Sequence, residues 1–419
     1  MKRDLPICVV GLGYVGLPLA HAFAKAGYQT YGYDIDASRI EELQSGKDRT
    51  RELSLKELQE ARITLSDDPS VIGKAAFIIL AIPTPVDQRS EPDLSLLLSA
   101  TETVGKHLKA GSTVVYESTV YPGVTEELCG PLLEKRSHLR RGRDFKLGYS
   151  PERVNPGDKE HTIDKIVKIV AGEDTETTEL LAEIYGSIVS VGIHRAPNIK
   201  VAEMAKAIEN AQRDLNIAYV NEISMLCEKL GIATRDVLAA ARTKWNFLPF
   251  TPGLVGGHCI GVDPYYLIEK ARELHMDTSM MSAARKTNDG MAHYVAEEVL
   301  RELALQKKDP KSTKILILGL TFKENIPDTR NSKVQDVIAA LEKAGCTVLA
   351  HDPFRNGFAF EDEKEQWDAI LLLVPHREYI EKTPSFFKAL GKTGCIFYDL
   401  KSVFSPEAFH KLGMTYLAL

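Results

Sequence analysis

A glycine-rich turn near the start of the chain constrains the fold more than any other feature of the sequence. Four apolar residues, Ile7-Cys8-Val9-Val10, lead directly into Gly11-Leu12-Gly13-Tyr14-Val15-Gly16. Glycines at this spacing let a strand turn tightly into a helix, and they leave the backbone open to a pyrophosphate at the N-terminus of that helix. The turn therefore predicts a dinucleotide-binding α/β domain at the beginning of the chain.

Asp34 indicates which dinucleotide would bind there. It follows the second expected strand, residues 30–33, at the distance expected for a carboxylate that binds a ribose. Such a carboxylate accepts hydrogen bonds from a free 2′-hydroxyl and repels a 2′-phosphate, so NAD is favoured over NADP. Arg39 could weaken this preference, although one basic residue on a following helix is more often a solvated surface charge.

Short apolar runs alternate with helical patterns in the first and last thirds of the chain. This alternation predicts parallel, doubly wound sheets. The expected strands are residues 7–10, 30–33, 76–80, 113–116, 145–149 and 166–170, and then 314–319, 347–350, 369–373 and 395–399. Residues 198–230 contain neither Pro nor Gly and repeat apolar residues at helical spacing, which predicts one long helix, and a second helical stretch covers residues 277–305.

These patterns predict an α/β fold with two Rossmann-like doubly wound lobes joined by a central all-helical domain that contains the long helix. The expected domains are residues 1–196, 197–306 and 307–419, with a polar linker at residues 306–312. A helical middle between two lobes often supplies a subunit interface, so we expect a homodimer or a higher homo-oligomer.

Composition excludes several classes of partner. The 52 Lys and Arg residues against 58 Asp and Glu give a net charge of −6, so no global field favours nucleic acid or an anionic membrane. No apolar run reaches membrane-spanning length, and the N-terminus lacks the pattern of a secretory signal. The six cysteines have no paired metal-type spacing, so we expect a reducing cytoplasm, no disulfides and no metal site.

Cys259 differs from the other cysteines in its surroundings. Cys8 and Cys395 lie in apolar strands, as core residues do. Cys259 follows Gly256-Gly257-His258, and Asp263 comes about one helical turn later, so a thiol on an exposed loop could lie near a carboxylate. A thiol that adds to an aldehyde retains a hydride to donate and leaves a thioester that water can open. Together with a hydride acceptor, Cys259 therefore predicts oxidation of an alcohol to an acid.

Lys206 and Asn210 form a second candidate site in the long helix. They are one helical turn apart and share a face, where an ammonium and an amide could together stabilise an oxyanion. Most such pairs face water. The surrounding residues are rich in alanine and aliphatic side chains, so this pair could be buried instead.

Seven motifs, in order along nearly the whole chain, resemble those of the UDP-glucose/GDP-mannose dehydrogenase family. They are the turn at residues 11–16, Pro83-Thr84-Pro85, Glu117-Ser118-Thr119-Val120, Ser150-Pro151-Glu152-Arg153, Lys206 with Asn210, Gly257-His258-Cys259, and Thr321-Phe322-Lys323. Within the family, residues 208–216, 245–250 and 257–266 resemble the branch that oxidises UDP-N-acetylhexosamines.

The resemblance implies an NAD-dependent, four-electron oxidation of the C6 hydroxyl of UDP-N-acetylglucosamine to the uronic acid, for surface polysaccharides such as capsule or O-antigen. UDP-N-acetylgalactosamine is a close alternative, and UDP-N-acetylmannosamine and UDP-glucose stay open. A one-step hydroxy-acid dehydrogenase and a non-catalytic nucleotide-sugar sensor are more remote alternatives. The first of these needs no cysteine and would form one NADH, not two.

The resemblance also implies roles for individual residues. Cys259 would be the nucleophile, Lys206 and Asn210 would stabilise the oxyanion, Thr119 and Glu152 would position water and assist proton transfer, and Asp263 would help to activate the water. The implied NAD contacts are Gly11, Gly13, Tyr14, Val15, Gly16, Asp34, Arg39, Pro83, Thr84, Thr119 and Arg330. The implied UDP-sugar contacts are Glu152, Arg153, Lys206, Asn210, Phe247, Leu248, Gly256, Lys323 and Lys401.

Two positions depart from the family's pattern. Gly261-Val262 stand where many relatives carry Pro-Lys, and Lys401 stands where some carry arginine. A lysine cannot reproduce the bidentate contact of an arginine. We expect both differences to tune recognition of the sugar.

Overall fold

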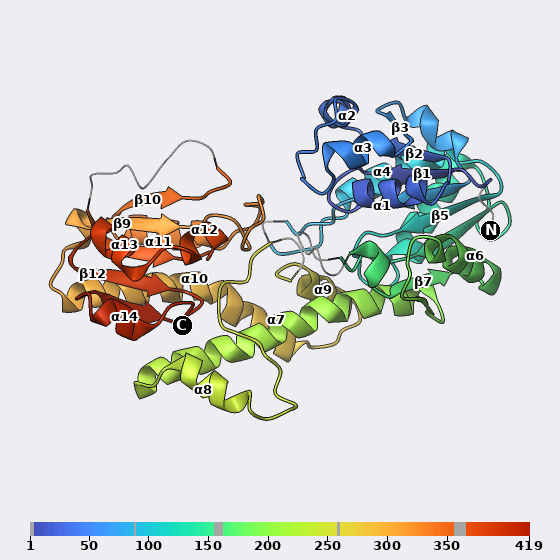
Figure 1. Ribbon diagram of the computed structural model, residues 1–419. Coiled ribbons are helices and arrows are strands. Elements are labelled where there is room, and N and C mark those ends of the chain that lie inside the picture. Colours follow the sequence, from blue (N-terminus) through green and yellow to red (C-terminus); the bar gives the residue numbers. More distant parts are fainter. Residues whose placement is uncertain (1–3, 88, 155–161, 258–259, 356–365) are drawn as a thin grey trace. The chain divides into compact units, whose positions relative to one another are not determined.

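The computed structural model describes residues 4–87, 89–154, 162–257, 260–355 and 366–419 (Figure 1). The chain packs as two compact units, Met1–Glu209 with Tyr265–Met276 and Asn210–Pro264 with Asp277–Leu419. Because this division passes through two helices, each unit is described by itself.

The first unit is built on an eight-stranded sheet in the order β3-β2-β1-β4-β5-β6-β7-β8. Its first six strands are all parallel, and they have the strand order of a dinucleotide-binding sheet, with the order reversing between β1 and β4. This confirms the predicted Rossmann-like lobe. The strands are β1 (Ile7–Val10), β2 (Thr30–Tyr33), β3 (Ile63–Ser66), β4 (Phe77–Leu80), β5 (Ser112–Tyr116), β6 (Phe145–Tyr149), β7 (Lys168–Gly172) and β8 (Ile193–Arg195).

Helices connect the strands of this sheet. The residues of β1 and β4 are all buried, so these strands read as the continuous apolar runs that parallel sheets need. The connecting elements are α1 (Gly16–Lys25), α2 (Ala37–Gln44), α3 (Leu55–Glu60), η1 (Pro69–Lys74), α4 (Ser95–His107), η2 (Val124–Cys129), α5 (Gly130–Ser137), η3 (Ile163–Lys165) and α6 (Thr175–Gly186).

One strand departs from the parallel pattern. β7 runs antiparallel to β6, with Gly148 opposite Gly172 and Tyr149 opposite Ala171. The chain leaves β6 at its C-terminal end, and the described residues before β7 contain no helix longer than the single turn η3. Without a crossover helix to return the chain to the other end of the sheet, the next strand pairs in the opposite direction.

The second unit contains a five-stranded, fully parallel sheet in the order β10-β9-β11-β12-β13. One face packs against apolar residues of α10 and α11, and the other packs an aromatic cluster with Phe387, Phe397 and Phe409. Burial on both faces confirms the second doubly wound lobe. The strands are β9 (Lys314–Leu318), β10 (Thr347–His351), β11 (Trp367–Leu372), β12 (Gly391–Asp399) and β13 (Thr415–Ala418).

The long helix is present as predicted. It is α7 (Ile199–Leu230), 32 residues in length, and a second long helix, α10 (Ser279–Leu305), occupies the other expected stretch. The other helices beyond the first sheet are α8 (Thr234–Ala241), α9 (Asp263–Glu273), η4 (Pro310–Ser312), α11 (Val334–Lys343), α12 (Arg377–Ile380), α13 (Pro384–Leu390) and α14 (Pro406–His410). The expected linker at residues 306–312 therefore includes one turn of 3₁₀ helix.

The sequence analysis missed three strands, β3, β8 and β13, and all three lie at the edges of their sheets. None of the residues in these three strands is buried, because an edge strand packs on fewer sides. They consequently lack the apolar runs by which the central strands were recognised.

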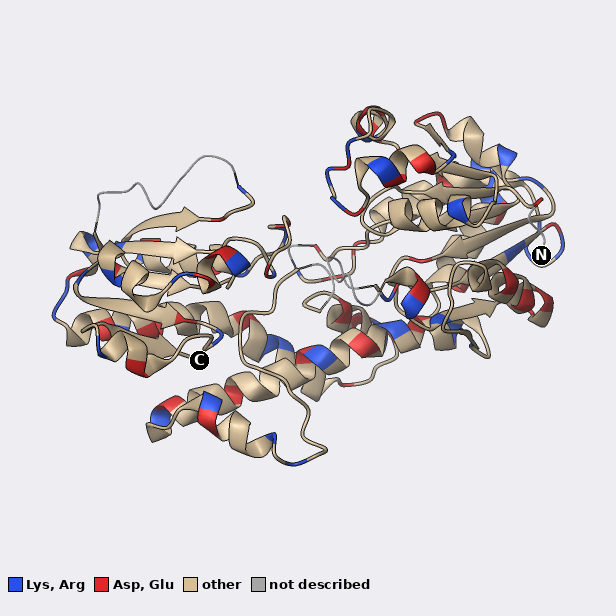
Figure 2. Ribbon diagram, viewed as in Figure 1, with Lys and Arg blue, Asp and Glu red and all other residues tan. Residues whose placement is uncertain are grey.

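Lys and Arg residues are interspersed with Asp and Glu along the ribbons of both units (Figure 2). Within the described ranges, no helix is long and apolar enough to cross a membrane. The same ranges contain no group of three or more His, Cys, Asp or Glu side chains that could hold a metal ion. The five cysteines that are described are all buried and unpaired.

Glu298 provides a test of the packing in the second unit. Its buried carboxylate accepts a hydrogen bond from Tyr398 Oη at 2.5 Å, and burial raises the pKa of Glu298 from 4.5 to about 7. Between these values the folded chain keeps a proton that the unfolded chain releases, so stability falls as the pH rises through this window. Glu298→Gln cannot ionise and should gain up to about 3 kcal/mol relative to the wild type on going from pH 5 to pH 8.

Thermal unfolding of both proteins at pH 5 and pH 8 measures this difference. Glu297→Gln is the matched control, because Glu297 is exposed on the same helix. An equal pH dependence of wild type and Glu298→Gln would contradict the prediction.

Candidate active site

The turn after β1 has a structure that fits a dinucleotide. Gly11 has φ +90°, and a β-carbon on it would lie 2.7 Å from the carbonyl oxygen of Ala81. A β-carbon on Gly16 would lie only 1.8 Å from the carbonyl oxygen of Gly11. Next to Gly13, in contrast, no described heavy atom lies within 4 Å of where a β-carbon would be. The fold itself needs two of the glycines, and the third leaves open space before the N-terminus of α1, where a pyrophosphate would bind.

Asp34 follows β2 and lies beside this turn. Its Oδ2 accepts a hydrogen bond from the backbone N–H of Leu12 at 2.8 Å, and its Oδ1 accepts one from Asp36 N–H at 3.0 Å. Each carboxylate oxygen therefore has a further lone pair with which to bind a ribose hydroxyl. The structure brings Asp34 and the glycine-rich turn together, as the sequence predicts.

Arg39 is not a solvated surface charge. Its side chain is buried, with Nε donating to the Leu12 carbonyl oxygen at 3.0 Å and Nη2 paired with Asp48 at 2.7 Å. Arg39 thereby ties the glycine-rich turn to the segment after α2. Arg39 therefore lies near the expected dinucleotide and also holds the turn in place, a structural role that was not predicted from the sequence.

Thr84 and Thr119 lie together where β4 and β5 end. The Thr84 hydroxyl donates to the Thr119 carbonyl oxygen at 2.6 Å, and Pro83 next to Thr84 is exposed. Tyr266 of α9 donates from Oη to the Thr84 carbonyl oxygen at 2.9 Å. Because β4 runs parallel to its neighbour β1, and β5 runs parallel to β4, their C-terminal ends lie at the same edge of the sheet as the glycine-rich turn.

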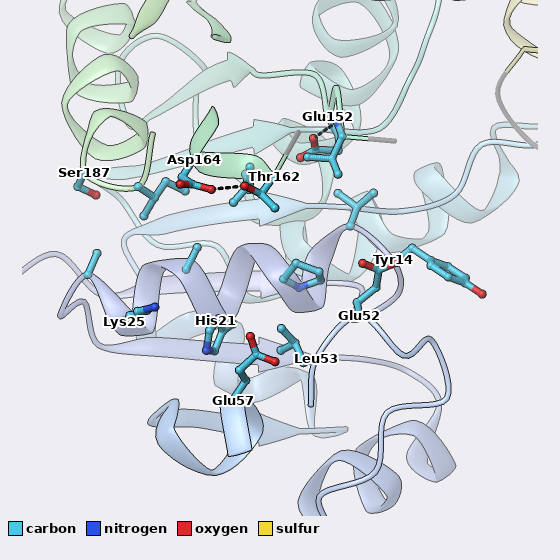
Figure 3. Close-up of a pocket in the computed structure, with 17 residues that line it drawn as sticks. Tyr14, His21, Lys25, Glu52, Leu53, Glu57, Glu152, Thr162, Asp164 and Ser187 are labelled. Atoms are coloured by element: carbon cyan, nitrogen blue, oxygen red, sulfur yellow. Dashed lines mark hydrogen bonds between the residues drawn. The ribbon is translucent and has the colours of Figure 1, made fainter. Parts of the chain in front are cut away.

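A cavity of about 540 Å³ runs along α1 in the first unit. Tyr14 and Glu152 lie toward one end of it, and Lys25 and Ser187 lie toward the other (Figure 3). Glu152 therefore borders a space that also contacts the glycine-rich turn. The Arg153 guanidinium beside it pairs with Glu209 at 2.8 Å.

Lys206 is buried in an unusual way. The residue is only 9% exposed, yet its side chain makes no hydrogen bond or ion pair with any described residue. A buried ammonium without a partner is costly, so such residues usually mark a binding site. Lys206 is thus available to an anionic group of a ligand.

Asn210, one turn further along α7, contacts Asp263 in the second unit. Asn210 Nδ2 donates to Asp263 Oδ2 at 2.5 Å, and both residues are buried. An amide nitrogen carries two hydrogens, so Asn210 keeps one for another acceptor. Asp263 is the first residue of α9, where a carboxylate is favoured by the partial positive charge of the helix N-terminus.

Three of the residues expected to contact the sugar nucleotide line one small cavity of the second unit. Gly256, Lys323 and Lys401 border a space of about 30 Å³, close to the volume of one water molecule. Lys401 Nζ donates to the Pro252 carbonyl oxygen at 3.1 Å, and burial lowers the pKa of Lys401. A β-carbon on Gly256 would lie 2.6 Å from the Asn331 carbonyl oxygen, so this glycine permits a close approach of two backbones.

Other expected residues are not gathered into this cavity. Leu248 is exposed and Phe247 partly so, in the segment after α8. Arg330 is about half exposed and pairs with Asp328 at 2.6 Å. Cys259, the expected nucleophile, and His258 lie outside the described residues.

The sequence analysis missed Lys168, which lies in β7 and contacts Glu152. Lys168 Nζ lies 2.8 Å from Glu117 Oε2 and 3.2 Å from Glu152 Oε2, and all three side chains are buried or nearly so. The signal was visible as a single charged residue within the apolar run Ile166-Val167-Lys168-Ile169-Val170. A lysine in a buried strand requires acidic partners, and these lie just after the ends of β5 and β6.

Comparison with known proteins shows which family the chain resembles. Models of the UDP-glucose/GDP-mannose dehydrogenase family match its NAD binding domain to residues 5–189, its central domain to residues 200–290 and its UDP binding domain to residues 316–406. The Staphylococcus aureus protein named CapL is 47% identical over 417 residues, which cover 97% of each chain. The UDP-N-acetyl-D-glucosamine 6-dehydrogenase of Pseudomonas aeruginosa is 45% identical over 419 residues, which cover 97% of this chain and 98% of that one.

A solved structure shares the whole fold. The UDP-D-ManNAc dehydrogenase of Pyrococcus horikoshii superposes with a TM-score of 0.92 at 30% sequence identity and covers 99% of both chains. From the three matched domains and these full-length relatives, we conclude that the chain belongs to the UDP-glucose/GDP-mannose dehydrogenase family and is an NAD-dependent nucleotide-sugar dehydrogenase.

Proposed function

We propose that this chain oxidises the C6 hydroxyl of UDP-N-acetylglucosamine to a carboxylate. The observation that carries the proposal is Lys206, a buried ammonium with no partner among the described residues, one helical turn before Asn210. Such a pair can stabilise the oxyanion that develops on C6 oxygen. The choice of sugar is supported by the Pseudomonas aeruginosa relative, which is named for this substrate.

The proposed reaction has two oxidation steps separated by a covalent intermediate. The C6 alcohol first loses a hydride and a proton to give the aldehyde, and the Cys259 thiolate adds to that aldehyde to give a thiohemiacetal. Loss of a second hydride leaves a thioester on Cys259. When bound, NAD accepts the hydride in each oxidation. Water then opens the thioester, which releases the uronic acid and restores the thiol.

Several residues would assist the oxyanion and the water. Lys206 favours the oxyanion by its charge, and the second amide hydrogen of Asn210 completes the pair. Thr119 and Glu152 would position the water and assist proton transfer, and Asp263 would help to activate the water. The hydrogen bond from Asn210 to Asp263 supports a shared task for these two residues, because it fixes both side chains.

The proposal also names one sugar among several that the family oxidises. The structural relative from Pyrococcus horikoshii is named for the manno epimer, so UDP-N-acetylmannosamine stays an alternative together with UDP-N-acetylgalactosamine and UDP-glucose. Lys401 and the Gly261-Val262 pair, which depart from the family's pattern, are the positions that we expect to set this choice.

We further propose three domains with boundaries near residues 196 and 306, with the three matched family domains as support. A homodimer or larger oligomer formed through α7 is supported by the large apolar residues that this helix exposes, among them Val201, Met204 and Tyr219. We also propose that the reaction takes place in the cytoplasm and that its product is a precursor of surface polysaccharide.

The yield of NADH per mole of limiting substrate tests the reaction and the substrate together. UDP-N-acetylglucosamine, UDP-N-acetylgalactosamine, UDP-N-acetylmannosamine and UDP-glucose are each offered with NAD. Two equivalents of NADH from UDP-N-acetylglucosamine are expected, because both hydrides leave the same carbon. One equivalent would indicate a one-step alcohol dehydrogenase, and binding without turnover of any sugar would indicate a sensor.

Cys259→Ser should abolish release of the acid or stall the enzyme at a covalent ester, because a serine hydroxyl stays protonated near neutral pH and is a poorer nucleophile than a thiolate, and an alkoxide is a poorer leaving group. Mass spectrometry of the intact protein and of the product measures both outcomes. Cys346→Ser is the control, since Cys346 is buried in the last lobe. Undiminished acid production by Cys259→Ser would exclude Cys259 as the nucleophile.

Lys206→Met should lower kcat by about 10²–10³, the usual loss when one oxyanion donor is removed, without destabilising the fold. Steady-state kinetics and the Tm measure these effects. Lys200→Met is the matched control on the same helix, because Lys200 is half exposed and pairs with Glu127. Wild-type kcat in Lys206→Met would refute the oxyanion role.

A further inference from the structure

Lys168 is a buried cation shared by two carboxylates. It lies in β7 with its side chain only 4% exposed, and its Nζ donates to Glu117 Oε2 at 2.8 Å and to Glu152 Oε2 at 3.2 Å. The same Nζ lies 5.3 Å from the ring centroid of Tyr185 in α6. The Lys168 ammonium is therefore hydrogen-bonded to the carboxylates of both Glu117 and Glu152.

Glu117 is fully enclosed in this cluster. Its side chain has no exposed surface, its Oε2 accepts from Lys168, and its Oε1 accepts from Tyr185 Oη at 2.5 Å. With both oxygens bound inside the protein, Glu117 has no route to a substrate. Its carboxylate is connected to that of Glu152 through Lys168.

Glu152 differs because it borders the cavity along α1 and its side chain is 12% exposed. Its Oε1 accepts from the backbone N–H groups of Arg153 and Val154, both at 2.6 Å. Among the residues that the structure describes, only Lys168 donates to its Oε2, which leaves one lone pair on Oε2 for a water molecule or a substrate.

We propose that Lys168 is a positioning residue for Glu152, which keeps this carboxylate ionised and aims its free Oε2 lone pair, while Glu117 and Tyr185 hold Lys168 in place. This inference rests on the proposed role of Glu152 in positioning water and assisting proton transfer. It adds the group that prepares Glu152 for that role.

The charges in the cluster agree with this assignment. Burial raises the pKa of Glu117, against the opposing effect of Lys168. Burial would also raise the pKa of Glu152, but the Lys168 ammonium and the two backbone N–H groups outweigh it and lower the pKa. Arg153, the charged residue next to Glu152 in the chain, is directed to Glu209 and to the Val167 carbonyl oxygen, and Glu52 and Asp164 line the same cavity as Glu152.

Stability alone does not explain the cluster. A buried ion pair is often no more stabilising than apolar residues of the same volume, because both charges lose their hydration. Glu152 accepts two backbone hydrogen bonds and one from an ammonium, and it keeps one lone pair open. Such a carboxylate stays ionised near neutral pH and can act as a base.

The test compares Lys168→Met with Glu117→Gln, and each variant changes one partner of the same buried cluster. Selective ¹³C labelling of glutamate carboxyl groups reports the pKa of Glu152, with its signal assigned by its absence in Glu152→Gln. Lys168→Met should raise this pKa by about one unit or more, because the favourable charge is lost. Glu117→Gln should not raise it, because this variant removes no positive charge and leaves the Lys168 ammonium beside Glu152.

The kinetic readout is the rate of acid formation as a function of pH. Between the raised pKa of Glu152 in Lys168→Met and its lower pKa in the wild type, the ratio of the Lys168→Met rate to the wild-type rate should fall by up to about tenfold for each unit that the pH is lowered, and the ratio for Glu117→Gln should stay level. Lys165→Met is the matched control, because Lys165 is exposed three residues before Lys168. If Lys168→Met does not fold, the double variant with Glu117→Gln is compared with Glu117→Gln alone, since it leaves no uncompensated second carboxylate.

Each outcome decides the inference. An unchanged Glu152 pKa in Lys168→Met, or a raised pKa with a level rate ratio, would overturn it. The carboxyl titration needs no substrate, so it stands even if no UDP-sugar is oxidised, in which case the proposed function fails separately.

Discussion

In each lobe, a carboxylate at the end of one strand binds the backbone of the turn that follows its neighbour. Asp34 Oδ2 accepts from Leu12 N–H at 2.8 Å, and Asp352 Oδ2 accepts from Leu320 N–H at 2.6 Å. The glycine before each leucine has a positive φ, +90° at Gly11 and +94° at Gly319. This interaction fixes the turns on which the candidate functional groups of both lobes depend, because it satisfies backbone groups that neither sheet nor helix can pair.

The two turns then differ in what they can bind. After Gly11 the chain enters α1 almost at once, so a helix N-terminus faces the open space beside Gly13. After Gly319 the next described helix is α11, and Asp352 also contacts Nε2 of the buried His376 at 3.1 Å. An aspartate already occupied by a histidine has less capacity for a ribose than Asp34 has. The same local structure thus supports dinucleotide binding in one lobe and a differently organised loop around Thr321 and Lys323 in the other.

How much of this could be read from the sequence depends on how local each signal is. The turn at residues 11–16 and the long helix α7 were predicted closely, because glycine spacing and helical periodicity act within a few residues. The edge strands β3, β8 and β13 and the direction of β7 were missed, because partial burial leaves no apolar run and strand direction depends on the connection. The burial of Arg39 was also missed, since its partner Asp48 belongs to a later loop. Lys168 pairs with Glu117, 51 residues earlier, which no local pattern can show.

The first unit contains two buried lysines in opposite situations. Lys168 is surrounded by acidic partners, whereas Lys206 has none among the described residues. The charge of the first lysine is compensated by acidic side chains, and the charge of the second is not compensated by any residue that the structure describes. This contrast agrees with the roles that we propose, in which Lys168 positions another side chain and Lys206 binds a ligand.

The burial of the cysteines has a practical consequence. Cys8, Cys129 and Cys395 are fully enclosed, and burial raises the pKa of each thiol to about 12. Cys346 and Cys227 are also buried. A thiol reagent therefore reaches these five cysteines poorly while the chain stays folded, so their modification would report unfolding.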